Sequence, residues 1–221
     1  MYKACIFDLD GTLTDTLESL TYSVNATLKE LHLPCITSEQ CKSFVGSGAR
    51  CLMERALRAA GDKELIHMEN AMEIYGRIFK ENCTYHVAPY EGVVEMLRHL
   101  KEAGVKLAVL SNKPHLQTLD VVATFFEEGT FAHVQGQQDN VPRKPDPTAA
   151  LMIAEKLGVS KEECVYIGDS DVDMQTGKAA GMETVGVTWG FRPKKLLLEH
   201  GAKHTIDYPK EFISIVKKEQ R

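Results

Sequence analysis

An alternation of short apolar runs with helical stretches constrains the fold of this chain more than any other feature. The strand-like runs are Ala4–Phe7, Val105–Leu110, a weaker run at Phe131–Val134, Cys164–Ile167 and Thr184–Val187. Helical patterns separate the later runs, at 91–103, 115–126, 147–157 and 172–180. Continuous apolar runs are typical of strands buried on both faces, and strand–helix alternation joins parallel strands by right-handed crossovers. We therefore predict an α/β fold, in which a Rossmann-like parallel sheet is flanked by helices.

Residues 15–85 interrupt this alternation with a purely helical pattern. Apolar residues that recur every three or four positions indicate a first helix; they are Leu17, Leu20, Val24, Leu28 and Leu31. Asp15 and Glu18 have the spacing of a capping box at its start. Further helices are predicted over 39–44, capped by Ser38, over 49–60, ended by Gly61, and over 62–82. The sequence thus predicts a four-helix cap domain, residues 15–85, inserted into an α/β core domain of residues 1–14 and 86–221.

The charge balance and the cysteines narrow the class of protein. The 221 residues include 26 Lys and Arg against 31 Asp and Glu, a formal net charge of −5, which argues against a non-specific binder of nucleic acids or membrane surfaces. Six cysteines occur without a C-x-x-C motif, which favours free thiols in a reducing compartment. No apolar stretch approaches the roughly 18 residues of a membrane span. We expect a cytoplasmic monomer or homodimer with no nucleic-acid or membrane partner.

Polar side chains follow the strand-like runs, or lie in loops that can return to the same edge of the sheet. They are, in chain order, Asp8, Asp10, Ser111, Asn112, Lys144, Asp169 and Asp173. Ligands of open α/β sheets bind outside the carboxyl ends of the strands. Several carboxylates at one site stay ionised only beside a cation, and hard oxygen ligands suit Mg²⁺, which prefers a phosphate partner. The pattern therefore predicts Mg²⁺-dependent chemistry on a phosphate ester.

Asp8 and Asp10 suit the two halves of phosphate-ester cleavage. They are two residues apart, so in an extended chain their side chains point the same way. One carboxylate can attack phosphorus and form an aspartyl-phosphate. The other can protonate the leaving group and then take a proton from the hydrolytic water.

Four motifs in chain order resemble those of the haloacid dehalogenase superfamily of aspartate-nucleophile phosphatases. They are Asp8-Leu9-Asp10-Gly11-Thr12, Ser111-Asn112, Lys144-Pro145 and Gly168-Asp169-Ser170-Asp171-Val172-Asp173. The resemblance implies that Asp8 is the nucleophile and Asp10 the general acid and base. It also implies that Mg²⁺ is held by the Asp8 carboxylate, the Asp10 backbone carbonyl and Asp169, with Asp173 as a further acid of the metal site.

The resemblance also implies contacts to the substrate. Ser111 and Lys144 would bind the transferring phosphoryl group. Within the helical insert, Val45-Gly46-Ser47-Gly48-Ala49-Arg50 is similar to phosphoglycolate phosphatases. The candidate substrate-binding residues are therefore Gly11, Thr12, Asn112, Gly48 and Arg50. An ordinary interhelical turn at Gly48 and a solvated helix residue at Arg50 are the alternatives in the insert.

The predicted function is a Mg²⁺-dependent phosphatase that hydrolyses a small phosphorylated metabolite, either phosphoglycolate-like or a sugar phosphate. A phosphohexomutase of the β-phosphoglucomutase type would share every core motif and is the main alternative. A pyrophosphatase or nucleotidase of the same superfamily is a lesser alternative. A phospho-acceptor signalling domain uses a similar acidic cluster, but such domains are shorter and carry no helical insertion.

Overall fold

The computed structural model describes residues 2–217 and is built on a six-stranded parallel sheet. The strands are β1 (Ala4–Phe7), β4 (Lys106–Pro114), β5 (His133–Gln137), β6 (Cys164–Gly168), β7 (Glu183–Val187) and β8 (His204–Ile206). Their order across the sheet is β5-β4-β1-β6-β7-β8, and every neighbouring pair is parallel. β1 therefore lies between β4 and β6, where the strand order reverses. Open α/β sheets bind their ligands at this kind of position.

Helices cover both faces of the sheet. The core helices are α5 (Val93–Glu102), α6 (His115–Phe125), α7 (Thr148–Leu157), α8 (Asp171–Ala180), α9 (Lys194–Glu199) and α10 (Pro209–Lys217), with a 3-10 turn at Lys161–Glu163. Cys5 and Phe7 of β1 belong to a hydrophobic cluster with α5, α6 and α10, whereas Ala4 and Ile6 pack with α7 and α8. All four side chains are fully buried, which confirms the prediction of an α/β sheet covered on both faces.

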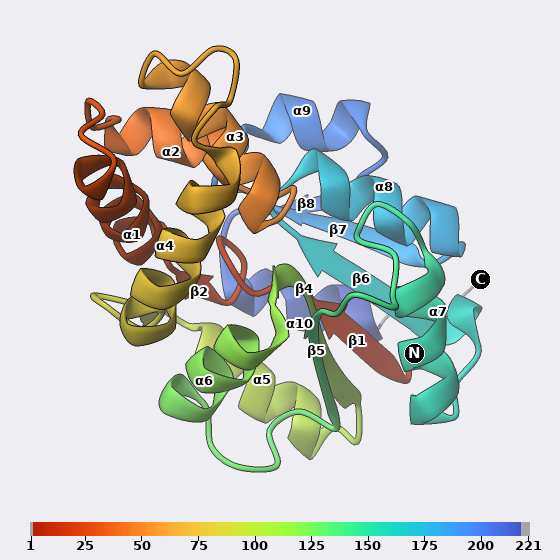
Figure 1. The fold of residues 1–221 in the computed structure, drawn as a ribbon. Helices are drawn as coiled ribbons and strands as arrows, with labels where there is room; N and C mark the ends of the chain where they lie inside the picture. The colour runs from red at the N-terminus through yellow and green to blue at the C-terminus, as the bar shows by residue number, and fades with distance from the viewer. Residues whose placement is uncertain (1, 218–221) are drawn as a thin grey trace.

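Four further helices form a separate unit beside the sheet. They are α1 (Leu17–Glu30), α2 (Ser38–Phe44), α3 (Ala49–Ala59) and α4 (Met68–Asn82). Their apolar side chains make a hydrophobic cluster of their own, to which the core contributes Phe191. The two chain crossings pair as the antiparallel strands β2 (Thr14–Asp15) and β3 (Ala88–Pro89). Figure 1 shows α1–α4 gathered on one side, apart from the helices that flank the sheet.

The start of α4 differs from the prediction. The predicted helix over 62–82 begins at Met68 instead. The Asp62 carboxylate accepts hydrogen bonds from the backbone nitrogens of Ile66 and His67, both at 3.0 Å. Aspartate side chains that bond nearby backbone groups compete with helix formation, so this segment is a turn.

Two predicted helix caps are also wrong. Asp15 and Glu18 form no capping box at α1: Asp15 accepts a hydrogen bond from the Leu17 nitrogen, and Glu18 forms an ion pair with His86. At α2 the cap is Thr37 rather than Ser38, and Gln40 completes the capping box. Both changes move the cap by one residue, which is the scale at which sequence patterns lose resolution.

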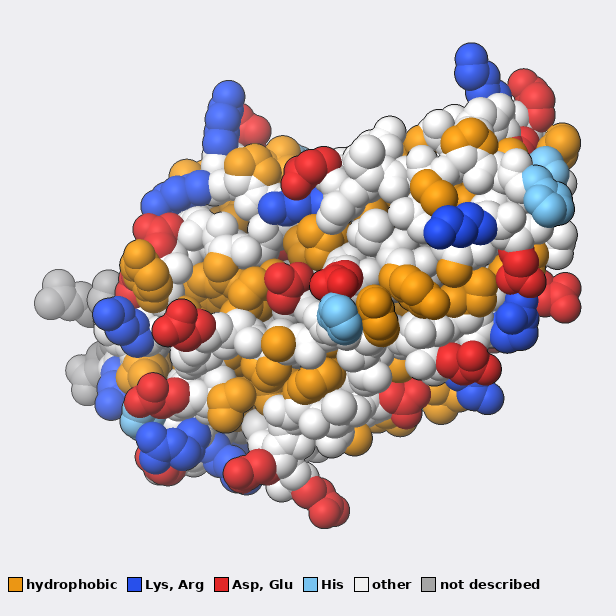
Figure 2. Space-filling model, turned by 90° about the vertical axis from the view of Figure 1, so that its left-hand side faces the viewer, with side chains coloured by type: hydrophobic (Ala, Val, Ile, Leu, Met, Phe, Trp, Pro, Cys, Tyr) orange, Lys and Arg blue, Asp and Glu red, His pale blue; other side chains and the backbone are white. Residues whose placement is uncertain are grey.

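The strands near the predicted site run longer than expected. β4 continues beyond Leu110 to Pro114, with an irregular register over its last residues, and β5 begins at His133 rather than at Phe131. β8, α9 and the β2–β3 pair were not predicted. Within residues 2–217, no helix is long and apolar enough to cross a membrane. On the face drawn in Figure 2, acidic and basic side chains are interspersed rather than gathered into a patch of one sign.

Candidate active site

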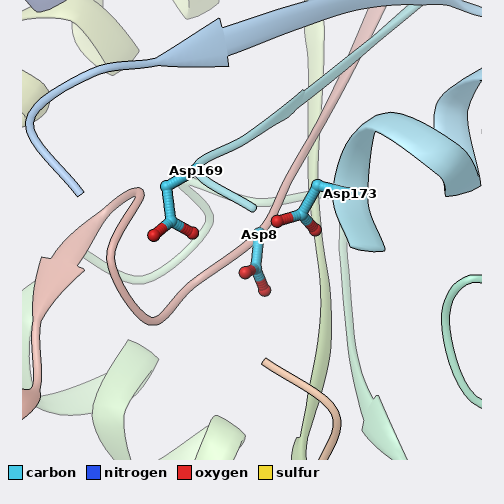
Figure 3. A group of neighbouring side chains, drawn as sticks. All are labelled: Asp8, Asp169 and Asp173. Carbon is cyan, nitrogen blue, oxygen red and sulfur yellow. The ribbon is translucent and has the colours of Figure 1, made fainter. Parts of the chain in front are cut away.

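The carboxyl ends of β1 and β6 bring three of the predicted acidic residues together. Asp8 directly follows β1, Asp169 follows β6, and Asp173 lies in the first turn of α8. Each offers a carboxylate oxygen within 4.8 Å of the others, and all three residues are buried. Figure 3 shows these carboxylates around one small space, carried by separate points of the chain.

Lys144 is a buried cation beside two of these three acids, Asp8 and Asp173. Its Nζ lies 2.8 Å from Oδ1 of Asp8 and 2.7 Å from Oδ1 of Asp173, and it donates a hydrogen bond of 3.1 Å to the Leu110 carbonyl. Burial by itself lowers the pKa of Lys144, but Asp173 and Asp8 outweigh burial and raise that pKa well above its usual value. Lys144 therefore remains an ammonium ion.

One ammonium ion does not balance three buried carboxylates. Burial, followed by repulsion from Asp173, raises the pKa of Asp8 to about 7 against the attraction of Lys144. Burial also raises the pKa of Asp169 well above its usual range, with Asp173 and Asp8 adding to the effect. Although it lies close to the Lys144 ammonium, the buried Oδ1 of Asp8 receives no well-directed hydrogen bond from the described residues. This buried, oxygen-only donor set fits a hard divalent cation such as Mg²⁺.

Backbone and hydroxyl donors orient the two acids that follow β6. Ser170 caps α8 and donates to Oδ2 of Asp173 from its backbone nitrogen, at 3.1 Å, and from its hydroxyl, at 2.5 Å. Oδ2 of Asp169 accepts a hydrogen bond of 2.7 Å from the Phe191 nitrogen. The loop after β7, which carries Phe191, is thus attached to the acidic cluster.

The predicted substrate contacts Gly11 and Thr12 lie against Asp169 instead of lining the cavity described below. The Thr12 hydroxyl donates to Oδ1 of Asp169 over 3.4 Å, and only 1% of Thr12 is exposed. Gly11 has a φ of +86°, and a Cβ atom there would collide with the Asp169 carboxylate and the Phe191 ring. In this structure both residues position an acid of the cluster.

Asp10 faces a second buried cation. Its Oδ1 lies 3.0 Å from Nζ of Lys113, whose ammonium also sits 4.7 Å from the centroid of the Phe79 ring on α4. Lys113 is not among the site residues predicted from the sequence. The available signal was its place directly after Ser111 and Asn112, in a segment that was expected to carry anion-binding groups.

Ser111 and Asn112 lie within the last residues of β4, and both are buried. The Ser111 hydroxyl accepts a hydrogen bond from the Lys113 nitrogen at 3.2 Å. The Asn112 amide exchanges hydrogen bonds with the Lys144 backbone, at 3.0 and 3.1 Å, and donates one to the Gly46 carbonyl at 3.0 Å. Asn112 thus joins the Lys144 loop to the helical unit.

A small cavity of about 40 Å³ lies where the helical unit meets the strand ends. The core contributes polar and charged lining residues: Asp8, Asp10, Ser111, Asn112, Lys113, Lys144, Asp169, Ser170 and Arg192. The helical unit contributes a mostly apolar wall: Leu20, Val45, Gly46, Gly48, Ala49, Leu52, Tyr75 and Phe79. A water needs roughly 10–15 Å³ by this measure, so the enclosed part of the cavity is small and suits a compact ligand.

Core side chains hold the segment 42–48 of the helical unit. Arg192 donates hydrogen bonds to the carbonyl oxygens of Lys42 at 2.7 Å, Val45 at 2.6 Å and Ser43 at 3.2 Å. Arg143 reaches the Ser47 carbonyl at 3.4 Å. Together with Asn112, these arginines make a clasp, a name we keep for the side chains of Asn112, Arg143 and Arg192.

The two candidate residues of the helical unit, Gly48 and Arg50, have different surroundings in the structure. Gly48 lines the cavity, has a φ of +88° and approaches the side chain of Arg143. Arg50 does not line the cavity: its guanidinium forms an ion pair of 2.5 Å with Glu69, and its side chain is 54% exposed. Of the two, Gly48 alone lines the cavity, and a substrate contact at either residue stays a prediction.

A family model, sequence relatives and a solved structure that resemble this chain are all described as hydrolases or phosphatases. The family model of haloacid dehalogenase-like hydrolases matches residues 5–187. The chain is 32% identical over 220 residues to a phosphoglycolate phosphatase of Colwellia psychrerythraea, covering 98% of this chain and 97% of the relative. It is 33% identical over 189 residues to a phosphoglycolate phosphatase of Aquifex aeolicus, covering 86% of each. A crystal structure described as a predicted phosphoglycolate phosphatase from Haemophilus somnus superimposes with a TM-score of 0.91 at 27% identity, covering 98% of both chains.

Proposed function

Because this chain belongs to the haloacid dehalogenase-like hydrolase family, we propose that it is a Mg²⁺-dependent phosphatase of small phosphate esters. The proposal includes an aspartyl-phosphate intermediate on Asp8 and a phosphoglycolate-like substrate. One observation carries it: Asp8 lies beside Lys144, Asp169 and Asp173 and lines the cavity between the helical unit and the strand ends. A carboxylate nucleophile, a cation and a metal-compatible acidic cluster are what phosphoryl transfer needs.

In this mechanism Asp8 attacks phosphorus while the bond from phosphorus to the ester oxygen breaks. Asp10 gives its proton to the departing oxygen, then removes a proton from the water that cleaves the Asp8–phosphorus bond. Ser111 and Lys144 bind the transferring phosphoryl group. Asp8, Asp169, Asp173 and the Asp10 carbonyl would hold Mg²⁺, which supplies neutralisation of the acidic cluster and polarisation of the phosphoryl oxygens.

Residues 15–85 would act in this scheme as a cap domain on a core of residues 1–14 and 86–221. Support comes from the separate hydrophobic cluster of α1–α4 and from the paired crossings at β2 and β3. A cap joined at two adjacent crossings can open for the substrate and close to exclude water. Release of the clasp on 42–48 would accompany opening.

The proposal also places the protein in the cytoplasm, as a monomer or homodimer that acts on a soluble metabolite. All six cysteines are free thiols, and four of them are buried. Free thiols of this kind are typical of reducing compartments.

A phosphate-release screen with Mg²⁺ tests the proposed function. The panel contains 2-phosphoglycolate, sugar phosphates, nucleoside monophosphates and pyrophosphate. We expect Mg²⁺-dependent release of phosphate, greatest with a short phosphate ester, and its loss on chelation. Asp8→Asn should turn over below about one-thousandth of the wild-type rate, whereas the matched control Asp15→Asn, at an exposed aspartate of β2, should keep it. Full activity in chelator, or transfer of phosphate between positions of a sugar without release, would contradict the proposal.

A further inference from the structure

Lys113 is a buried ammonium ion to which the proposed mechanism gives no role. It lies in the last residues of β4 and lines the cavity. Its side chain is 1% exposed, and its Nζ lies 3.0 Å from Oδ1 of Asp10. An ammonium ion held this far from water needs acceptors for its donors, because an uncompensated buried charge is costly.

Among the described residues, Lys113 has fewer hydrogen-bond acceptors than its ammonium has N–H donors. A lysine ammonium has three N–H donors, and Asp10 is the one acceptor that a described residue provides to Lys113. Lys144 differs, since Asp8, Asp173 and the Leu110 carbonyl surround its ammonium. The Phe79 ring on the other side of Lys113 supplies attraction for the charge but no conventional acceptor.

The arginines around the cavity are already engaged. Arg192 and Arg143 direct their donors at backbone carbonyls of 42–47. Arg50 pairs with Glu69 outside the cavity. Lys113 is therefore the cation of the described cavity lining that has donors free for an anionic ligand.

We infer that Lys113 recognises a carboxylate on the leaving group of the substrate, an inference that rests on the proposed function. Asp10 would protonate the ester oxygen, and the Lys113 ammonium lies 3.0 Å from Oδ1 of the same carboxyl group. The carboxylate must then sit close to the ester oxygen, on the adjoining carbon. The small cavity and its apolar wall, which includes Phe79 and Leu52, leave little room beyond such a group. The substrate class is a short 2-phosphorylated carboxylic acid.

The test compares two substrates that differ in this carboxylate alone. They are 2-phosphoglycolate and 2-hydroxyethyl phosphate, whose leaving groups are both poorly acidic alcohols that need protonation by Asp10. A change in Lys113 that acts through Asp10 alters both reactions alike, so the ratio of their kcat/KM values isolates recognition of the carboxylate. The variants are Lys113→Met, which keeps the length of the side chain, and Lys113→Arg, which keeps the charge. Lys106→Met is the matched control, because Lys106 is an exposed lysine at the opposite end of β4.

We expect wild-type protein to prefer 2-phosphoglycolate and Lys113→Met to lose about 10- to 100-fold of that preference, the range of one charged hydrogen bond. Most of the loss should appear as a higher KM. Lys113→Arg should retain part of the preference, and Lys106→Met all of it. Equal losses on both substrates, or an unchanged ratio, would overturn the inference.

If Lys113→Met does not fold, the two esters can still be compared with the wild-type protein. Hydrolysis of both esters with equal kcat/KM would contradict recognition of a carboxylate while leaving the phosphatase function intact. Failure to hydrolyse any phosphate ester in Mg²⁺ would instead refute the proposed function itself. The two failures are therefore distinguishable in one set of assays.

Discussion

Burial makes ionisation of the Asp8 carboxyl group depend on a nearby cation. Its pKa lies near 7, because burial and Asp173 outweigh Lys144. The folded protein therefore holds a proton that the unfolded chain releases above about pH 4. Without metal, this group contributes stability at low pH that is lost as the pH rises through about 7. Asp169, whose pKa is also raised by burial, acts in the same direction.

Stabilisation by Mg²⁺ should consequently depend on pH. Mg²⁺ binds the ionised carboxylates, so at pH 5 it must displace the Asp8 proton, most of which has left by pH 8. We predict that saturating Mg²⁺ raises the melting temperature of the protein more at pH 8 than at pH 5, measured by thermal unfolding. Sodium chloride of equal ionic strength is the control and should produce a small, similar shift at both values. An equal Mg²⁺ shift at the two pH values would contradict the assignment of the acidic cluster to a cation.

At the scale of single residues, the sequence predicted the strand-end cluster but not which residues of the insert line the cavity. Asp8, Asp169 and Lys144 meet because each directly follows a strand or its loop, and strand ends share an edge. Arg50 and Lys113 could not be distinguished in this way. Which of them faces the cavity depends on how the helical unit sits on the sheet, and no local pattern encodes that.

Among the elements, the segment 42–48 shows how the core and the helical unit are joined. Arg192 satisfies carbonyl oxygens at the end of α2, which otherwise lack helical partners. Each clasp residue is also attached to the candidate site: Asn112 follows Ser111, Arg143 precedes Lys144, and Arg192 follows Phe191, which bonds Asp169. The contacts that hold the helical unit on the core and the arrangement of the site are thus linked through the same short stretches of chain.

Weakening the clasp should loosen α2 and slow the reaction. Lysine cannot reproduce the three carbonyl contacts that the Arg192 guanidinium makes. We predict that Arg192→Lys lowers kcat/KM by about 10-fold or more, the equivalent of one charged hydrogen bond, and speeds amide hydrogen exchange across residues 38–48. Arg77→Lys is the control, since Arg77 is an exposed arginine of α4 that pairs with Glu30. Unchanged exchange in 38–48 would show that Arg192 does not restrain this segment.

The helix ends show where sequence patterns lose resolution. The hydrophobic repeat predicted α1 well, but the residue that caps a helix depends on competing hydrogen bonds. Glu18 forms an ion pair with His86, which lies far along the chain. The Asp62 carboxylate accepts a hydrogen bond from the Ile66 nitrogen and so stabilises a turn in place of the first helical residues. Apolar periodicity therefore predicted that the helices exist, whereas local polar contacts decided where they begin.

Across the whole molecule, the parallel sheet and the inserted helices followed from the order of strand and helix patterns. The late elements β8 and α9 did not, because a three-residue edge strand and a six-residue helix carry too little periodicity. The cavity between the helical unit and the sheet could not be predicted either, since its two walls come from segments that are distant in sequence. Docking of one hydrophobic unit on another is decided by three-dimensional shape.

If Asp8 carries the phosphoryl group, the phosphorylated intermediate can be trapped chemically at this residue. Asp10→Asn is mixed with Mg²⁺ and p-nitrophenyl phosphate, whose good leaving group departs without a proton from Asp10, while the next step still lacks its general base. The mixture is quenched, treated with borohydride, which reduces an acyl phosphate to an alcohol, and digested for mass spectrometry. We predict homoserine at position 8 and unmodified residues at Asp169 and Asp173. Release of p-nitrophenol with Asp8 left intact, or homoserine at one of the other two aspartates, would contradict it.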